Sequence, residues 1–166
     1  LPKIFRVAII TLSDRASAGE YKDLSGPRIS DLSKKWFKQH ALLYDFENIV
    51  IPDEKLIFHD TLNDCFEKEY DIIFTTGSTG IGERDIAPEV IRPLLEKELP
   101  GIMDFIRLKY GEKHPNALLS RATAGLKNKT LLFSMPGSPK AVTEYMEEIQ
   151  KILWHSMLML HGINSH

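Results

Sequence analysis

The strongest constraint on the fold of this chain is the order of three patterns within residues 71–90. An apolar run at 71–74 predicts a buried strand, and Pro88 is suited to the first turn of a helix. Between them lies a loop of small residues, 75–85, with the sequence TTGSTGIGERD. Glycines let backbone N–H groups converge on an anion, and the dipole of the following helix adds positive potential. The loop predicts an anion site or, with equal weight, a tight strand-to-helix turn. It lacks the Gly-Lys-Ser/Thr ending of a P-loop.

Composition is that of an ordinary globular protein. The chain has 166 residues, of which 43% are hydrophobic and 27% charged, so we expect a single domain over residues 1–166 with a sizeable core. A formal net charge of −2 gives no long-range attraction to nucleic acid or to an anionic membrane, and we expect neither partner. No signal-peptide pattern and no apolar run of transmembrane length is present, which predicts a cytoplasmic protein.

Cysteine and histidine usage excludes several kinds of chemistry. The single cysteine, Cys65, cannot form an internal disulfide or a cysteine-based zinc site. It shares a predicted helix face with Ile57 and Thr61, which favours a buried, inert thiol. The six histidines have no ligand-like spacing. No Ser-His-Asp or Cys-His set can be assembled, which argues against acyl transfer.

Strand-like and helix-like patterns alternate along the chain, which predicts an α/β fold. We expect a three-layer sandwich, in which a mostly parallel central sheet carries one antiparallel hairpin and has helices on both faces. Charged Asp45 and Glu47 place their strand at an edge of the sheet. Pro93 should kink its helix or delay the regular part of that helix. Residues 162–166 resemble a loose tail. Strands are expected at 4–12, 41–51, 72–75, 117–124 and 129–133, the last two forming the hairpin through the link 127–128. Helices are expected to open at Pro27, to surround Cys65, to cover 88–98 and 102–111, and to begin at Pro139 under a Ser138 cap.

Three segments rich in small polar residues follow predicted strands: 13–15, 76–80 and 136–138. In a parallel sheet, ligands bind at the carboxyl ends of the strands, so we expect these segments to meet at one edge. Asp53 and Asp85 stand beside them, and Mg²⁺ commonly bridges carboxylates and a polyphosphate. The residues alone therefore predict a phosphate- or nucleotide-binding α/β domain that could use Mg²⁺.

The same side chains have structural explanations, which the sequence leaves open. Asp53 is placed to cap the Cys65 helix, and the residues alone favour this structural role over a catalytic one. For Asp85, a turn or an ion pair with Arg84 is an equal alternative to a functional role. Other structural alternatives are a turn motif at Ser13 and Asp14, a solvent-facing strand position for Ser120, and surface salt bridges instead of phosphate clamps for Arg84 and Arg121.

Taken together, the motifs resemble those of the molybdopterin adenylyltransferase family. The match runs in the family's order from about residue 4 to residue 160, essentially the whole chain. Its central part is the loop 75–80 followed by Arg84, Asp85 and the Pro88-Glu89 pair. The other matching motifs are 10–26, 51–54, 99–101, 119–121 and 135–139.

The resemblance implies a Mg²⁺-dependent nucleotidyltransferase of molybdenum cofactor biosynthesis. Such an enzyme transfers AMP from ATP to the terminal phosphate of molybdopterin and releases pyrophosphate. Asp53 and Asp85 take the positions of the family's two functional aspartates, one holding Mg²⁺ or the ATP phosphates and the other orienting the pterin. The substrate-binding positions implied are Ser13, Asp14, Thr76, Gly77, Ser78, Thr79, Gly80, Ser120, Pro136, Gly137 and Ser138.

Family members form homotrimers and can hand their product to a downstream metal-insertion protein, so the resemblance implies both here. Two departures stand out. Ser78 replaces a glycine that is usual in the family, and serine would be strained if the position needs a positive φ. Ala87 replaces a Ser or Thr cap that is frequent before Pro88. Two other functions remain open: a relative that binds molybdopterin without turnover, and a nucleotide- or anion-binding module.

Overall fold

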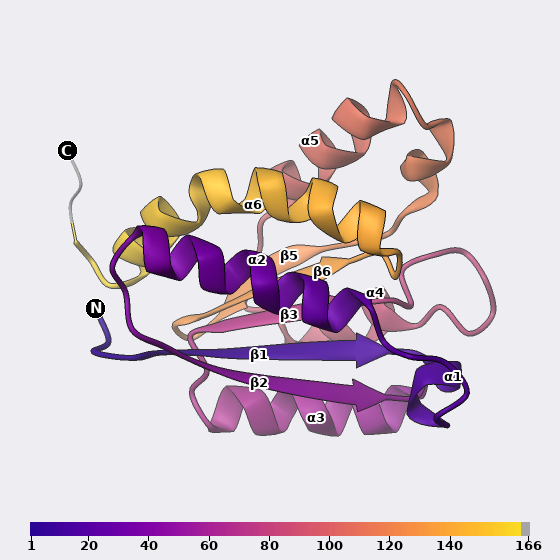
Figure 1. Cartoon of the computed structure of the whole chain (residues 1–166), viewed down its shortest axis with the longest axis horizontal. Coiled ribbons are helices and arrows are strands. Elements are labelled where there is room, and N and C mark those ends of the chain that lie inside the picture. Colours follow the sequence, from indigo (N-terminus) through magenta and orange to yellow (C-terminus); the bar gives the residue numbers. More distant parts are fainter. Residues whose placement is uncertain (164–166) are drawn as a thin grey trace.

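The computed structural model describes residues 1–163, which form a single six-stranded sheet in the order β2-β1-β3-β6-β5-β4 (Figure 1). Neighbours in the β2-β1-β3-β6 part run parallel, and β5 is antiparallel to both β6 and β4. The predicted parallel sheet with its hairpin is therefore confirmed, and β2 is the edge strand expected. The strands are β1 Phe5–Leu12, β2 Tyr44–Ile51, β3 Ile72–Thr76, β4 Lys97–Glu98, β5 Ala124–Lys127 and β6 Thr130–Met135.

Helices cover both faces of this sheet, as predicted (Figure 1). One hydrophobic core lies under α2, α5 and α6, and a second lies under α3 and α4. None of the helices within residues 1–163 is long and apolar enough to cross a membrane. The α-helices are α1 Asp14–Ser17, α2 Ser25–Gln39, α3 Lys55–Glu67, α4 Ala87–Ile91, α5 Pro100–Gly111 and α6 Pro139–Leu160; two 3₁₀ turns are η1 Arg92–Leu94 and η2 Pro115–Leu119.

The apolar character of β1 follows from its central position. Val7 and Ile9 face the core under α2 and α6, whereas Ala8 and Ile10 face the core under α3. Since successive side chains of a strand point to opposite faces, a strand covered on both sides must be apolar throughout. The continuous apolar run in the sequence of β1 is thus explained by burial of the strand on both faces.

The parallel strands also end together, which positions the site. In the strand register, Leu12 pairs with Ile51, Thr11 with Thr76, and Thr76 with Met135. The segments that follow β1, β2, β3 and β6 therefore leave the sheet at one edge. In Figure 1 this edge lies at the arrowheads of β1 and β2, where α1 is found.

The helix predicted over 88–98 is wrong in its second half. It starts at Ala87, and its cap position falls on Ile86. Helix α4 ends at Ile91 and continues only as the 3₁₀ turn η1. Pro93 has no N–H to donate, so the α-helical ladder cannot continue through it. Residues 97–98 are instead strand β4, paired with Gly125 and Leu126.

The hairpin is shorter than predicted. Residues 115–119 form η2, the chain is irregular at 120–123, and β5 begins only at Ala124. Its link is 128–129, with Asn128 at a φ of 53° that suits a tight hairpin turn. Ser120 and Arg121 therefore do not lie in the hairpin, and a solvent-facing strand position for Ser120 is wrong.

Several smaller boundaries and faces also differ. Helix α2 opens at Ser25, two residues before Pro27, because the Asp23 carboxylate accepts the amides of Ser25 and Gly26 at 3.0 and 3.1 Å. The predicted Cys65 face is partly wrong, since Ile57 is exposed and Cys65 is buried beside Leu62 instead. Burial raises the pKa of the Cys65 thiol to about 11, as expected for an inert cysteine. Of the predicted tail 162–166, residues 164–166 lie outside the described residues.

Candidate functional site

A cavity of about 750 Å³ lies at the carboxyl ends of the parallel strands. It is formed by the loops after β1, β2, β3 and β6, by the start of α6 and by the segment around η2. The structure thus brings the three predicted loops together with both predicted aspartates, while Asp14 lies beside the cavity and contacts Asp53. The predicted residues that line it are Ser13, Asp53, Thr76, Gly77, Ser78, Thr79, Gly80, Asp85, Ser120, Pro136, Gly137 and Ser138.

Two glycines of the central loop leave no room for a side chain, Gly77 because of a neighbouring backbone atom and Gly80 because of the Asp85 side chain. Gly77 has a φ of 96°, and a Cβ there would lie 2.3 Å from the carbonyl oxygen of Leu12. A Cβ on Gly80 would lie 2.7 Å from Oδ2 of Asp85. The Gly77 amide donates to the Met135 carbonyl at 3.0 Å. These contacts fix the loop against the ends of β1 and β6.

Ser78 has the positive φ that the sequence left in question. Its φ is 60° and its side chain is buried. The Ser78 hydroxyl accepts the Ile86 amide at 2.9 Å and donates to the Arg84 carbonyl at 3.1 Å. The Ser78 carbonyl accepts the Ala87 amide at 3.0 Å. Ser78 therefore binds the start of α4, where the cap residue Ile86 makes no side-chain capping bond.

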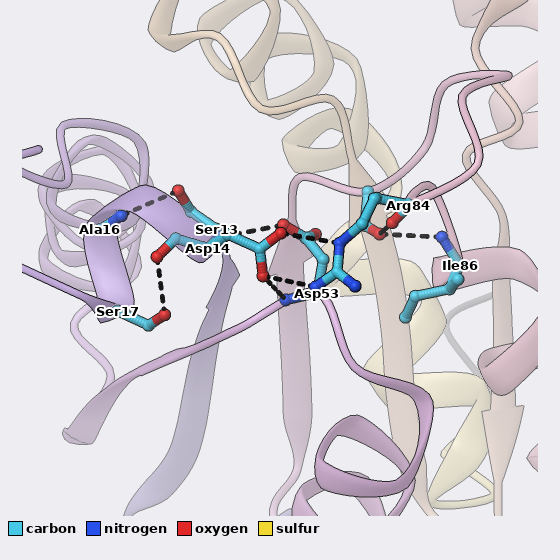
Figure 2. Close-up of polar contacts among 8 residues, drawn as sticks. Ser13, Asp14, Ala16, Ser17, Asp53, Arg84 and Ile86 are labelled. Atoms are coloured by element: carbon cyan, nitrogen blue, oxygen red, sulfur yellow. Dashed lines mark hydrogen bonds and ion pairs between the residues drawn. The ribbon is translucent and has the colours of Figure 1, made fainter. Parts of the chain in front are cut away.

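Asp14, Asp53 and Arg84 point toward one another (Figure 2). The Asp14 amide donates to Oδ2 of Asp53 and the Asp53 amide donates to Oδ1 of Asp14, both at 3.0 Å. Arg84 binds Asp14 with two hydrogen bonds of 2.8 Å, from Nε and Nη2. This contact lowers the pKa of Asp14. Three loops that follow different strands are thus linked by side chain and backbone.

Asp53 does not cap α3, so the structural interpretation favoured from sequence is wrong. The cap position is Glu54, which makes no side-chain capping bond. Asp53 is half-buried, and burial raises its pKa, opposed by hydrogen bonding with the Asp14 amide and the Ser78 hydroxyl. A half-buried carboxylate that faces a cavity is suited to bind a cation or a polar ligand.

Asp85 is held in a turn and is not paired with Arg84. Its Oδ2 accepts the Gly82 amide at 2.8 Å. Arg121 holds the same loop from the other side, donating from Nε to the Gly80 carbonyl and from Nη2 to the Asp85 carbonyl, each at 2.8 Å. Its Nη1 pairs with Glu89 and lowers the pKa of that carboxyl. Arg121 therefore supports the loop backbone and forms a salt bridge with Glu89, which is the alternative to a phosphate clamp that the sequence left open.

Ser120 lies beside a tyrosine that sequence reasoning missed. The Ser120 hydroxyl accepts from the Tyr145 hydroxyl at 3.2 Å and from the Ala122 amide at 3.3 Å. Burial raises the pKa of Tyr145. Tyr145 is buried among apolar residues of α6, a position typical of a core residue, and the sequence gives no sign of its polar hydroxyl contact.

Other cavity residues were missed because they lie outside the strand-exit loops. Tyr110 and His114 come from the end of α5 and the segment after it, and Lys140 and Glu144 come from the first turns of α6. Lys140 Nζ lies 3.1 Å from Nε2 of His114. Lys140 could have been found, because it follows the predicted cap Ser138 at a strand exit. The sequence around His114 gave no such signal.

The donor set suits a Mg²⁺ ion that arrives with phosphates. Asp53 and Asp85 line the same cavity, and Mg²⁺ usually takes one or two carboxylates together with phosphate oxygens and water. Within residues 1–163, no cluster of three or more His, Cys, Asp or Glu side chains could hold a metal ion by itself. The described residues therefore contain no metal site made of protein ligands alone.

Comparisons with known proteins agree on one family. Residues 8–155 match the family described as "Probable molybdopterin binding domain". The chain is similar to molybdopterin adenylyltransferase of Helicobacter pylori, with 36% identity over 143 residues, covering 86% of this chain and 80% of the relative. It is also similar to molybdopterin adenylyltransferase of Pyrococcus furiosus, with 36% identity over 159 residues, covering 93% and 90%. The solved structure of the molybdopterin biosynthesis enzyme MoaB of Thermus thermophilus superposes with a TM-score of 0.84 at 34% identity, covering 95% of this chain and 97% of that one.

Proposed function

The chain belongs to the molybdopterin-binding domain family, and from this premise we propose that it adenylylates molybdopterin as a step of molybdenum cofactor biosynthesis. An oxygen of the terminal phosphate of molybdopterin attacks the α-phosphorus of ATP. The bond between that phosphorus and the bridging oxygen to the β-phosphate breaks. The products are adenylyl-molybdopterin and pyrophosphate.

The observation that carries this proposal is the meeting of Asp53, Asp85 and the glycine loop in one cavity. Two anionic substrates must be held with their phosphates close together, which requires oriented N–H donors and cations. The glycine loop lines the cavity, and α6 starts there with Pro139 under the Ser138 cap, so that the helix dipole adds positive potential. Its relatives from Helicobacter pylori and Pyrococcus furiosus carry the name of this activity.

The residues present suit a reaction that needs no general base. A phosphate monoester has a second pKa of about 6 and is already an anion at pH 7. Catalysis then depends on positioning and on stabilisation of the charge that develops on pyrophosphate. Asp53 and Asp85 would hold Mg²⁺, which when bound supplies charge neutralisation between the phosphates. Lys140 adds positive charge at the cavity, whereas the charge of Arg84 is paired with Asp14.

The test is an incubation of the purified protein with molybdopterin, ATP and Mg²⁺, followed by mass analysis of the products. We expect adenylyl-molybdopterin and pyrophosphate in equal amounts, and neither product after chelation of Mg²⁺. Tight binding of molybdopterin without product would instead support the non-catalytic relative. Binding of ATP alone would support a nucleotide module.

We expect Asp85→Ala to lose at least about 100-fold in turnover, because it removes one of the two carboxylates proposed to hold Mg²⁺ against the phosphates. The matched control is Asp60→Ala on α3, a carboxylate whose side chain is 82% exposed and lies outside the cavity. Both variants should melt close to the unchanged protein. Near-normal turnover in Asp85→Ala would remove Asp85 from the mechanism.

A further inference from the structure

Ser78 occupies a conformation that disfavours its side chain. A φ of 60° is uncommon for a residue other than glycine, and Ser78 keeps it while buried in the wall of the cavity. Strain of this kind persists where surrounding contacts over-determine the position. The side chain must therefore make contacts that outweigh the preference for glycine.

Those contacts form a continuous chain that ends at Asp53. The Ser78 hydroxyl donates to the Arg84 carbonyl at 3.1 Å, and the Arg84 guanidinium binds both oxygens of Asp14. Asp14 and Asp53 then exchange side-chain and amide hydrogen bonds in both directions (Figure 2). Arg84 thus links the loop after β3 to the segments after β1 and β2, and Ser78 holds the backbone of Arg84 from within the same loop.

We propose that the Ser78 hydroxyl is a positioning group for the reaction, which holds the Asp53 carboxylate and the Arg84–Asp85 turn in a fixed relative arrangement. The proposal rests on the proposed adenylyl transfer. It assigns a role to the position at which this chain departs from the glycine of the family motif. The competing explanation is purely structural: Ser78 accepts the Ile86 amide and so completes the start of α4.

Two substitutions at this position separate the explanations. Ser78→Gly removes the hydroxyl and also relieves the strain, whereas Ser78→Ala removes the hydroxyl and keeps the strain. We therefore expect Ser78→Ala to melt at a lower temperature than Ser78→Gly. If the hydroxyl positions the site, both variants should lose kcat/KM by a similar factor, roughly 10–100-fold, despite their different stability. If the role is structural, activity should follow the melting temperature.

A matched control tests the effect of strain relief itself. Ala41 has a φ of 54° at the end of α2, outside the residues that line the cavity. Ala41→Gly should raise the melting temperature and leave kcat/KM unchanged. Any loss in Ser78→Gly is then a consequence of the missing hydroxyl and not of a glycine at positive φ.

A second measurement does not depend on turnover. The Asp14 amide donates to Asp53 at 3.0 Å, and its hydrogen exchange reports how firmly Asp53 is held. We expect that amide to exchange faster in both Ser78 variants, although residue 78 makes no hydrogen bond to it. Unchanged Asp14 exchange, or a kcat/KM of Ser78→Gly equal to that of the unchanged protein, would overturn the positioning role. Absence of product from the unchanged protein would overturn the adenylyl transfer, and Asp14 exchange would then decide the role of Ser78.

Discussion

At the scale of single residues, the glycine loop shows how backbone geometry dictates residue type. Gly77 and Gly19 both have a positive φ, but only Gly77 has another backbone atom in the space of a Cβ. Gly19→Ala should cost about 1–2 kcal/mol of unfolding free energy, from the left-handed conformation alone. Gly77→Ala should cost roughly 3–5 kcal/mol, because the clash with Leu12 is added. Urea unfolding of both variants measures the difference, and equal losses would show that the Leu12 contact relaxes.

The residue scale also separates what the sequence could predict of the site from what it could not. Asp53, Asp85 and the glycine loop follow predicted strands, so a topology rule was enough to place them together. The role of Arg121 could not be predicted, because it depends on carbonyl groups 36–41 residues away in the chain. The capping role of Asp53 was wrong for the same reason: its partner is Asp14, which lies 39 residues away at the start of α1.

At the scale of elements, the packing of α5 on α6 contains a buried carboxylate. Glu148 of α6 is buried and pairs with Lys109 of α5 and Lys151 of its own helix. Burial favours the neutral form, but the two lysine hydrogen bonds prevail and lower the pKa of Glu148 below its ordinary value of 4.5. The pairs therefore stabilise the fold above about pH 4.5, and this contribution is lost as the pH falls through the lowered pKa.

We expect Glu148→Gln to remove that part of the acid sensitivity. The melting temperature of the unchanged protein should drop between pH 6 and about pH 3 by more than that of Glu148→Gln, since only the carboxylate must take up a proton. At pH 6 the variant should be the less stable of the two, because Lys109 and Lys151 lose their partner. Parallel pH dependences of the two melting temperatures would show that Glu148 does not contribute.

Element boundaries were predicted well where local chemistry sets them and poorly where distant contacts do. Ser138 accepts the Ala141 amide at 3.1 Å, and α6 begins at Pro139 as its capping pattern predicted. Strand β4 is only two exposed residues long and exists because Lys97 and Glu98 pair with β5. A Cβ at the facing residue of β5, Gly125, would lie 2.5 Å from the Lys97 carbonyl. The residues at 97–98 have no local pattern that predicts their pairing with β5.

At the scale of the whole molecule, the sheet order brings together loops separated by more than 120 residues. Alternating strand and helix patterns were enough to predict the layers, because right-handed crossovers leave few arrangements open. The wall of the cavity formed by η2 and the end of α5 was not predictable. Neither segment directly follows a parallel strand, so the rule that places strand-exit loops at one edge does not apply to them. The family resemblance supplied the chemistry that the layers alone could not.

The homotrimer implied by that resemblance is a prediction for the whole molecule, and the surface of α5 and η2 is where we expect contact. Phe105 and Leu108 of α5 are 55% and 66% exposed, and Leu118 and Leu119 of the adjoining η2 are 54% and 52% exposed. Monomeric proteins rarely leave several large apolar side chains together in water. Leu119 also lines the cavity, so contact between copies there would border the site.

Light scattering behind a sizing column should give three times the mass of one chain for the unchanged protein. Leu108→Glu places a charge within the apolar surface and should shift the protein toward single chains, because burying an unpaired carboxylate is costly. Leu56→Glu is the matched control, since Leu56 is 79% exposed on α3, on the other face of the sheet. A trimer that withstands Leu108→Glu but dissociates with Leu56→Glu would place the contact on the α3 face, and a single-chain mass for the unchanged protein would contradict the trimer itself.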